Sequence, residues 1–143
     1  MKMTVLQVFE AAPLIAAIIR EQRRLPLKGA YRLARMHAKL APEYALAAEK
    51  HDALIVAYNH FEMVPPPKSK EDPLGQGPFV QSELNSVPAD KMGEFRAKWK
   101  EIAEEVIDID IEPISLALLD LGDAVPCSIQ ASELVMLGEL VTE

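Results

Sequence analysis

The residues of this sequence that could do chemistry are few and scattered. The chain holds three histidines, His37, His51 and His60, and a single cysteine, Cys127. The histidines do not occur in the H-E-x-x-H or H-x-E…C-x-x-C patterns that bind catalytic zinc, and Cys127 has no histidine near it in the sequence. No G-x-S-x-G or S-x-x-K motif for a nucleophilic serine is present. We therefore expect no catalytic residues, no enzyme activity and no cofactor.

Acidic residues alternate with isoleucines in the stretch V-I-D-I-D-I-E, residues 106–112. Such alternation is typical of a strand, here with Ile107, Ile109 and Ile111 on one face and carboxylates on the other. The carboxylates could bind a hard cation, but they lack the spacing of a calcium loop, and a solvent-facing strand is commonly acidic. We therefore expect no metal. The strand needs a partner, which is either Phe79–Gln81 or the edge of another chain that contacts the three isoleucines.

The clearest charge pattern is a basic stripe. Lys28, Arg32, Arg35 and Lys39 lie four, three and four residues apart, which places them on one face of a helix. Such a face could contact phosphates, an acidic protein surface or only water. The aromatic residues that would stack on bases are missing from the stripe, and the chain carries a net charge of −7. We therefore favour a protein contact over nucleic acid as the role of this stripe.

Charge is also divided unevenly along the chain. Residues 1–50 hold nine Lys/Arg and four Asp/Glu, whereas residues 51–143 hold six Lys/Arg and eighteen Asp/Glu. The first part is therefore positive by five charges and the second negative by twelve. This asymmetry favours association between unlike surfaces, either within the chain or between chains.

The elements that must position these residues are predicted to be mostly helices. Apolar spacing predicts a helix over about 26–59, with two apolar stripes that would be buried against more than one neighbour. Pro42 predicts a kink or break near Leu40 to Glu43. Earlier in the chain, Thr4 is a helix cap, and Pro13 predicts two helices, one ending near Glu10 and the other running to about Arg24.

The second half of the chain is more broken. A proline-rich loop is expected at 64–78, a short extended segment at 79–81, a helix opened by Pro88-Ala89-Asp90, one helical turn stopped at Gly122, and a final helix over about 129–141 capped by Ser128. We predict a mainly α fold, a helical bundle around a long kinked helix (about 26–59) with a small β element (about 79–81 and 106–111). The whole chain, 1–143, is expected to form a single domain.

The longest apolar run, Ala11 to Ile19, has nine residues, whereas a membrane-spanning helix needs about 20. The first residues also lack the pattern of a signal peptide, because Gln7 and Glu10 interrupt the apolar stretch. We therefore expect no membrane association and a cytoplasmic protein.

Two motifs carry a resemblance to known proteins. These are L-P-L-K-G-A-Y-R-L-A-R at 25–35 and E-E-V-I-D-I-D-I-E-P-I-S-L at 104–116, with an F-x-x-x-W-x-x-I helix before the second. In this order they resemble a family of small proteins of tailed bacteriophages and prophages, encoded near virion genes. The proline-rich loop at 64–78 departs from the pattern of that family.

The resemblance implies a non-enzymatic virion or virion-assembly component that contacts other phage proteins or itself, as an oligomer. Its location would then be the host cytoplasm or the virion. The alternative that the resemblance leaves open is a small phage-encoded binding protein that targets a host factor or ligand, such as a defence inhibitor.

Overall fold

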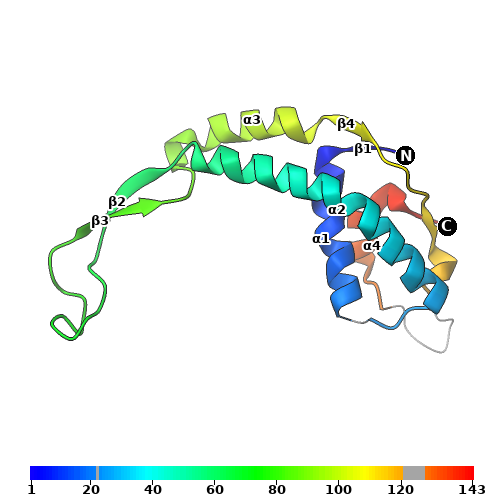
Figure 1. Ribbon diagram of the computed structural model, residues 1–143, viewed down its shortest axis with the longest axis horizontal. Helices are drawn as coiled ribbons and strands as arrows, with labels where there is room; N and C mark the ends of the chain where they lie inside the picture. The colour runs from blue at the N-terminus through cyan, green and yellow to red at the C-terminus, as the bar shows by residue number, and fades with distance from the viewer. Residues whose placement is uncertain (22, 121–127) are drawn as a thin grey trace. The chain divides into compact units, whose positions relative to one another are not determined.

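The fold is mainly α-helical, and a computed structural model of the chain describes residues 1–21, 23–120 and 128–143 (Figure 1). The expected roles of Gly122 and Cys127 lie outside the described residues. The described elements, in chain order, are β1 (Lys2–Thr4), α1 (Val5–Arg20), α2 (Leu27–Val56), β2 (His60–Val64), β3 (Val80–Leu84), the 3-10 turn η1 (Ala89–Lys91), α3 (Met92–Ala103), β4 (Val106–Asp108), β5 (Ile114–Ser115), the 3-10 turn η2 (Leu116–Leu118), α4 (Ala131–Leu137), the 3-10 turn η3 (Gly138–Leu140) and β6 (Val141–Thr142).

The chain divides into two compact units. Unit 1 comprises Met1–Glu49 and Glu101–Glu143, and unit 2 comprises Lys50–Lys100. The expected single domain over 1–143 stays a prediction. None of the helices in the described part of the chain is both long and apolar enough to cross a membrane.

Helix α1 begins, as predicted, at a Thr4 cap. The Thr4 hydroxyl accepts a hydrogen bond from the Gln7 N–H at 3.2 Å, and the Gln7 side chain accepts one from the Thr4 N–H at 2.8 Å. This reciprocal arrangement is a capping box. The expected break at Pro13 is wrong, because α1 is continuous from Val5 to Arg20. Pro13 itself is exposed, and the core contacts of the turns on either side hold the helix together.

Helix α2 starts where the sequence predicts. Its first turn is closed by a hydrogen bond of 2.9 Å from the Ala30 N–H to the Pro26 carbonyl, so Pro26 stands at the entrance and needs no N–H of its own. The helix then runs through Pro42 to Val56 without interruption. A break near Leu40 to Glu43 is therefore wrong, whereas a bundle arranged around a kink stays a prediction.

Only one of the two apolar stripes expected on α2 is buried. In unit 1, Leu33, Met36, Leu40 and Ala47 face the core. The other stripe is mostly open to solvent, where Leu27 is 87% exposed and Tyr31 is 62% exposed. The prediction of burial on two sides is corrected, because much of the open stripe is alanine, which costs little to leave in water and favours a helix in any environment.

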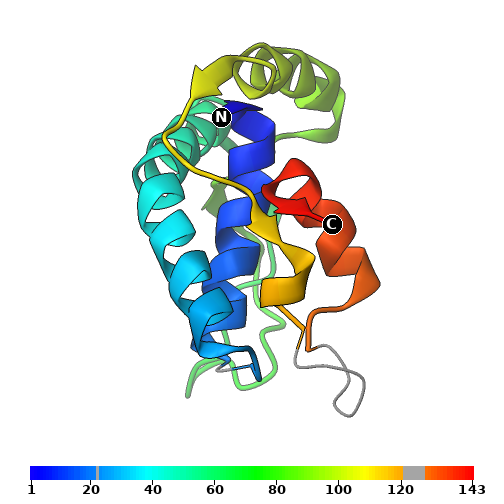
Figure 2. The same ribbon diagram turned by 90° about the vertical axis from the view of Figure 1, so that its right-hand side faces the viewer.

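The core of unit 1 lies between α1, the first part of α2 and α4. Figure 2 shows α1 with α2 on one side and α4 on the other, and the segment before η2 passes in front of them. The largest fully buried side chains come from α1 and α2 and from the segments around η2 and η3: Val8, Ile15, Ile18, Leu33, Leu40, Ile114, Leu119 and Leu140. Aliphatic burial of this kind is the main force that holds the unit together.

The predicted acidic strand is shorter than expected and pairs elsewhere. Strand β4 covers only Val106–Asp108 and runs antiparallel to β1, with Met3 opposite Ile107. The expected partner Phe79–Gln81 is wrong. Ile109 is buried in the core, and Ile107 and Ile111 pack against it. The side chains of these isoleucines are thus used inside the unit, and a strand-edge contact with another chain stays a prediction.

The end of the chain closes unit 1. Strand β5 pairs in parallel with β6, with Ile114 opposite Val141. Helix α4 is capped by Gln130 in a capping box with Glu133, and not by Ser128, whose hydroxyl donates a 2.7 Å hydrogen bond to the Arg24 carbonyl. The expected helix over 129–141 is therefore shorter. It ends before Gly138, whose φ of +53° takes the chain out of the helix.

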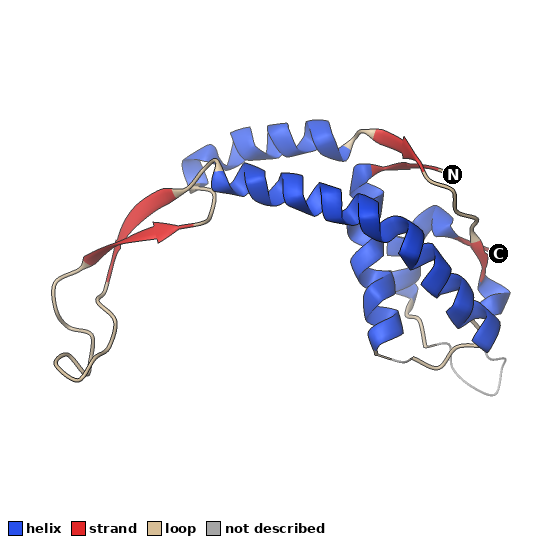
Figure 3. Cartoon of the chain, in the orientation of Figure 1, coloured by secondary structure: helices blue, strands red, loops and turns tan. Residues whose placement is uncertain are grey.

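Unit 2 contains an antiparallel hairpin of β2 and β3, whose strands are red in Figure 3. The loop expected at 64–78 agrees closely with the connection between the two strands. The extended segment expected at 79–81 overlaps the start of β3, Val80–Leu84. The helix opening at Pro88 is confirmed, since η1 follows it and leads into α3.

The His51 ring is half-buried, edge-on to Trp99 at a centroid distance of 4.8 Å, in line with a histidine used in packing.

Candidate functional site

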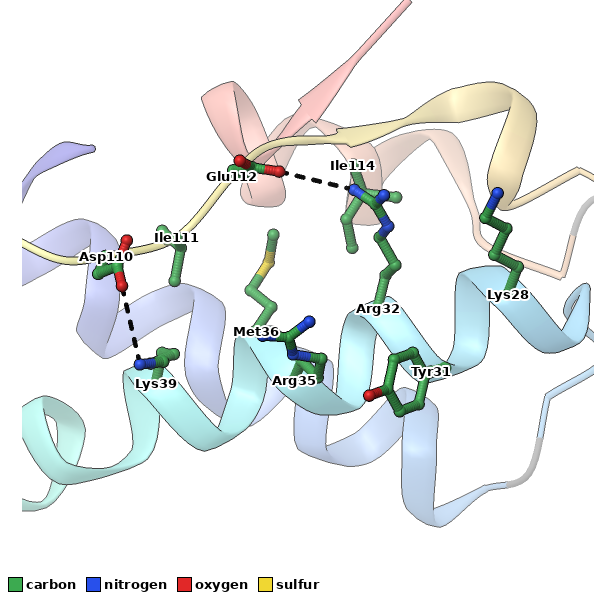
Figure 4. A pocket seen from close by; sticks show the side chains of 10 residues that line it. All are labelled: Lys28, Tyr31, Arg32, Arg35, Met36, Lys39, Asp110, Ile111, Glu112 and Ile114. Carbon is green, nitrogen blue, oxygen red and sulfur yellow. Dashed lines mark ion pairs between the residues drawn. The ribbon is translucent and has the colours of Figure 1, made fainter.

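The four basic residues predicted to share a helix face do so on α2, within unit 1. They form one side of a groove of about 420 Å³. Residues of the segment that follows β4 form the other side (Figure 4). We call this the basic groove, and the side chains that line it are Lys28, Tyr31, Arg32, Arg35, Met36 and Lys39 from α2, and Asp110, Ile111, Glu112 and Ile114 from the facing segment.

The facing segment is fixed at both of its ends. The Ile109 N–H donates a 2.8 Å hydrogen bond to the Met1 carbonyl, and the Ile109 side chain is buried. At the other end Ile114 is buried and paired with Val141. With these two residues held inside, the alternation of the sequence turns Asp110 and Glu112 outward. The isoleucine–acid pattern therefore builds a wall of the groove with carboxylates along its outer side.

A glycine sets how closely α2 approaches this wall. A Cβ atom added at Gly29 would lie 1.9 Å from the Leu118 carbonyl oxygen in η2. No other residue fits at that position without a shift of the backbone. Gly29 thus lets the first turn of α2 lie directly against η2, and the basic side chains that follow it are brought opposite the 110–114 segment.

Two ion pairs cross the groove, and both are long. Arg32 Nη1 lies 3.8 Å from Glu112 Oε2, and Lys39 Nζ lies 3.9 Å from Asp110 Oδ2. All four side chains are exposed, so water and salt screen the attraction, and each pair contributes roughly 0–1 kcal/mol. The carboxylates therefore occupy the basic face only loosely, and another anion could take their place.

The other two cations of the groove have no carboxylate partner within the described part of the chain. Lys28 takes part in no ion pair there, and the Arg35 guanidinium lies 6.0 Å from the centroid of the Tyr31 ring, within range of a cation–π contact. Four cations and two carboxylates line the groove, so its net charge is +2. An exposed site of this composition is suited to binding a negatively charged group beside apolar surface.

Several residues of the groove were missed or misread in the sequence. The helical period placed Tyr31 on a stripe expected to be buried, although it is exposed and lines the groove. The acidic residues Asp110 and Glu112 were considered as cation ligands or as a solvent-facing strand face, whereas the structure sets them against lysine and arginine. In the parts of the chain that the structure describes, no three His, Cys, Asp or Glu side chains gather closely enough to hold a metal ion.

Comparisons with known proteins give no relative. No protein-family model matches this sequence, and no curated protein or solved structure matches it. The geometry of the groove and the motifs of the sequence therefore carry the functional argument.

Proposed function

We propose that this chain works by binding another protein through the basic groove, as a non-enzymatic component of a tailed-phage virion or of its assembly. The observation that carries the proposal is the unbalanced charge of the groove. Lys28 and Arg35 face it without a carboxylate partner among the described residues, and the two carboxylates that are present pair at 3.8 and 3.9 Å with exposed side chains. An acidic partner would meet cations that are already in place.

The composition of the groove favours a protein over a nucleic acid. Its lining combines the cations with Tyr31, Met36, Ile111 and Ile114. A phosphate backbone would use only the cations, whereas a protein surface that carries both acids and aliphatic side chains would use both parts. Tyr31 is the one aromatic residue in the lining, which leaves no row of rings for successive bases.

The proposed phage origin is supported by the position of the two motifs. The motif at 25–35 includes Lys28, Arg32 and Arg35, which form the helical side of the groove. The motif at 104–116 includes the Asp110–Ile114 segment that faces them. The two stretches that resemble the phage family are thus the two stretches that build the site, as would be expected if the groove were the part of the chain used for contact.

The proposal is tested by following the chain into virus particles. Particles produced with the wild-type chain should contain it when they are analysed by mass spectrometry. The variant R32E/R35E should enter them at least about tenfold less, since it reverses two charges that the contact uses. The matched control is K68E/K70E, which makes the same charge change on exposed residues of unit 2 and should enter particles normally.

Two results would contradict the proposal. If the wild-type chain were absent from particles and instead co-purified with a host protein through Arg32 and Arg35, the chain would be a host-directed binding protein. If R32E/R35E and K68E/K70E entered particles equally well, the basic groove would not be the contact site.

A further inference from the structure

A second depression on unit 1 has the opposite character to the basic groove. It measures about 290 Å³ and is lined by parts of β1, α1, α4 and η3. Its charged residues are Glu10 and Glu139, both exposed and neither in an ion pair within the described chain. Two aliphatic side chains beside them are open to solvent, Val135 at 81% and Met136 at 51% exposure. We call this surface the α4 face.

The two surfaces complement one another in two independent ways. The basic groove has a net charge of +2, and the only ionisable side chains that line the α4 face are two carboxylates. The groove also has apolar lining, with exposed Tyr31 on its α2 side, and the α4 face offers Val135 and Met136. An exposed apolar patch with polar residues at its rim marks an interaction site, and Val135 and Met136 beside Glu10 and Glu139 have this arrangement.

We propose that the basic groove of one copy binds the α4 face of a second copy. This inference rests on the function proposed above and names the partner of that site. Glu10 and Glu139 of the second copy would take the cations Lys28 and Arg35, and Val135 and Met136 would cover Tyr31 and Ile111. Asp110 and Glu112 would be displaced from their long ion pairs toward solvent at little cost.

The contact that this pairing makes is head-to-tail, because the two surfaces differ. Each copy that is bound through its groove still presents its own α4 face to another copy. Repetition of one such contact builds a ring if the rotation closes and a filament if it does not. Either product suits a component of a virus particle, which is assembled from repeated identical contacts.

Sedimentation velocity of the purified full chain over a range of concentrations tests the pairing. The wild-type chain should associate at low salt, and about 0.5 M NaCl should weaken the association, because contacts between exposed charges are screened. The groove variant R32E/R35E and the face variant E10K/E139K should each be monomeric. The control K68E/K70E should associate as the wild type does. Circular dichroism verifies that every variant is folded.

A charge swap makes the test decisive. The single chain that carries both reversals, R32E/R35E with E10K/E139K, again has unlike surfaces and should recover association. If the wild-type chain stays monomeric at every concentration, the groove does not bind a second copy. The proposed contact with another protein would still be supported if the wild-type chain entered particles through Arg32 and Arg35. If the groove variant loses association and the charge-swapped chain does not recover it, the α4 face is not the partner surface.

Duplex DNA added to the wild-type chain should leave the assemblies intact, and their dissolution by DNA would overturn the proposal in favour of a phosphate ligand.

Discussion

The guanidinium of Arg23 donates a hydrogen bond to the carboxylate of Glu133, 110 residues further along the chain. The same nitrogen, Arg23 Nη1, lies 3.2 Å from the Ser128 carbonyl. Arg23 therefore ties the turn before α2 to the start of α4. The hydrogen bond from Arg23 is the main reason why the pKa of Glu133 is lowered. A second hydrogen bond, from the backbone N–H of Gln130, lowers it further. Arg23 is thus a basic residue that is used inside the unit.

The substitution Glu133→Gln should lower the free energy of unfolding by about 1.5–3 kcal/mol, the usual range for a hydrogen bond to a charged group. Because folding depresses the pKa of Glu133, the contribution of the pair is present above the unfolded pKa and is lost as the pH falls through the folded one. The difference between wild type and variant in urea unfolding should therefore be full at pH 7 and should shrink below about pH 4. Glu49→Gln, on an exposed residue of α2, should change little. A difference that did not depend on pH would contradict the role of this charge.

The substitution Gly29→Ala should destabilise the chain even though alanine is the better helix former. The added Cβ would meet the Leu118 carbonyl oxygen at 1.9 Å, so α2 or η2 must move. We expect a loss of about 1–3 kcal/mol in chemical denaturation, the usual cost of overpacking. The control is Gly93→Ala in the first turn of α3, where a Cβ meets nothing within 4 Å. That change should stabilise by about 0.5–1 kcal/mol. Equal effects at the two sites would show that the close approach at Gly29 has no energetic role.

The substitution Pro42→Ala should stabilise α2. Pro42 is exposed in the interior of the helix and has no N–H to donate to the carbonyl four residues before it. Alanine restores that donor, and we expect the free energy of unfolding to rise by about 1–3 kcal/mol. Pro26→Ala serves as the control, because Pro26 lies at the entrance of the helix and should show a much smaller change. A variant destabilised at Pro42 would indicate that the unit needs a bend there.

The double substitution Asp110→Asn with Glu112→Gln should leave stability nearly unchanged and strengthen self-association. It removes two exposed ion pairs worth roughly 0–1 kcal/mol each. It also raises the net charge of the groove from +2 to +4, so an acidic surface should bind more tightly, by about threefold or more at low salt. Sedimentation velocity measures this shift. The control Glu71→Gln with Asp90→Asn makes the same charge change on exposed residues of unit 2. An equal shift in the control would assign the effect to total charge.

Local patterns in the sequence predicted the features that depend on local geometry. The spacing of Lys28, Arg32, Arg35 and Lys39 fixed a common helix face, because residues three and four apart are neighbours on any α-helix. The Thr4 cap was recognisable for the same reason. The acidic wall of the groove could not be predicted, because Asp110 and Glu112 reach α2 through the pairing of β1 with β4, and that pairing joins residues about a hundred positions apart.

The errors have equally specific causes. Pro13 was expected to divide the first helical stretch into two helices, and Pro42 to kink or break α2. Both helices are continuous, because packing of the turns on both sides outweighs the loss of one hydrogen bond. The alternation at 106–112 predicted a strand of full length, whereas β1 offers only three residues to pair with, and β4 ends where that partner ends. The expected buried face of α2 was too wide because its alanines were counted as apolar core residues. Alanine is tolerated on either side of a helix.

The pairing of β1 with β4 also sets the order in which the chain can fold during synthesis. Lys2 pairs with Asp108, and Ile114 pairs with Val141, so unit 1 lacks its closing strands until residues 106–108 and 141–142 have been made. The ribosome adds about 5–20 residues per second, so α1 can pack against α2 early but must wait through that time for α4 to cover the rest of its apolar face. The hairpin of unit 2 needs only near neighbours in sequence and can form earlier. Wild-type folding should therefore be limited by closure of the long loop between residues 4 and 106, as expected for pairings of high sequence separation.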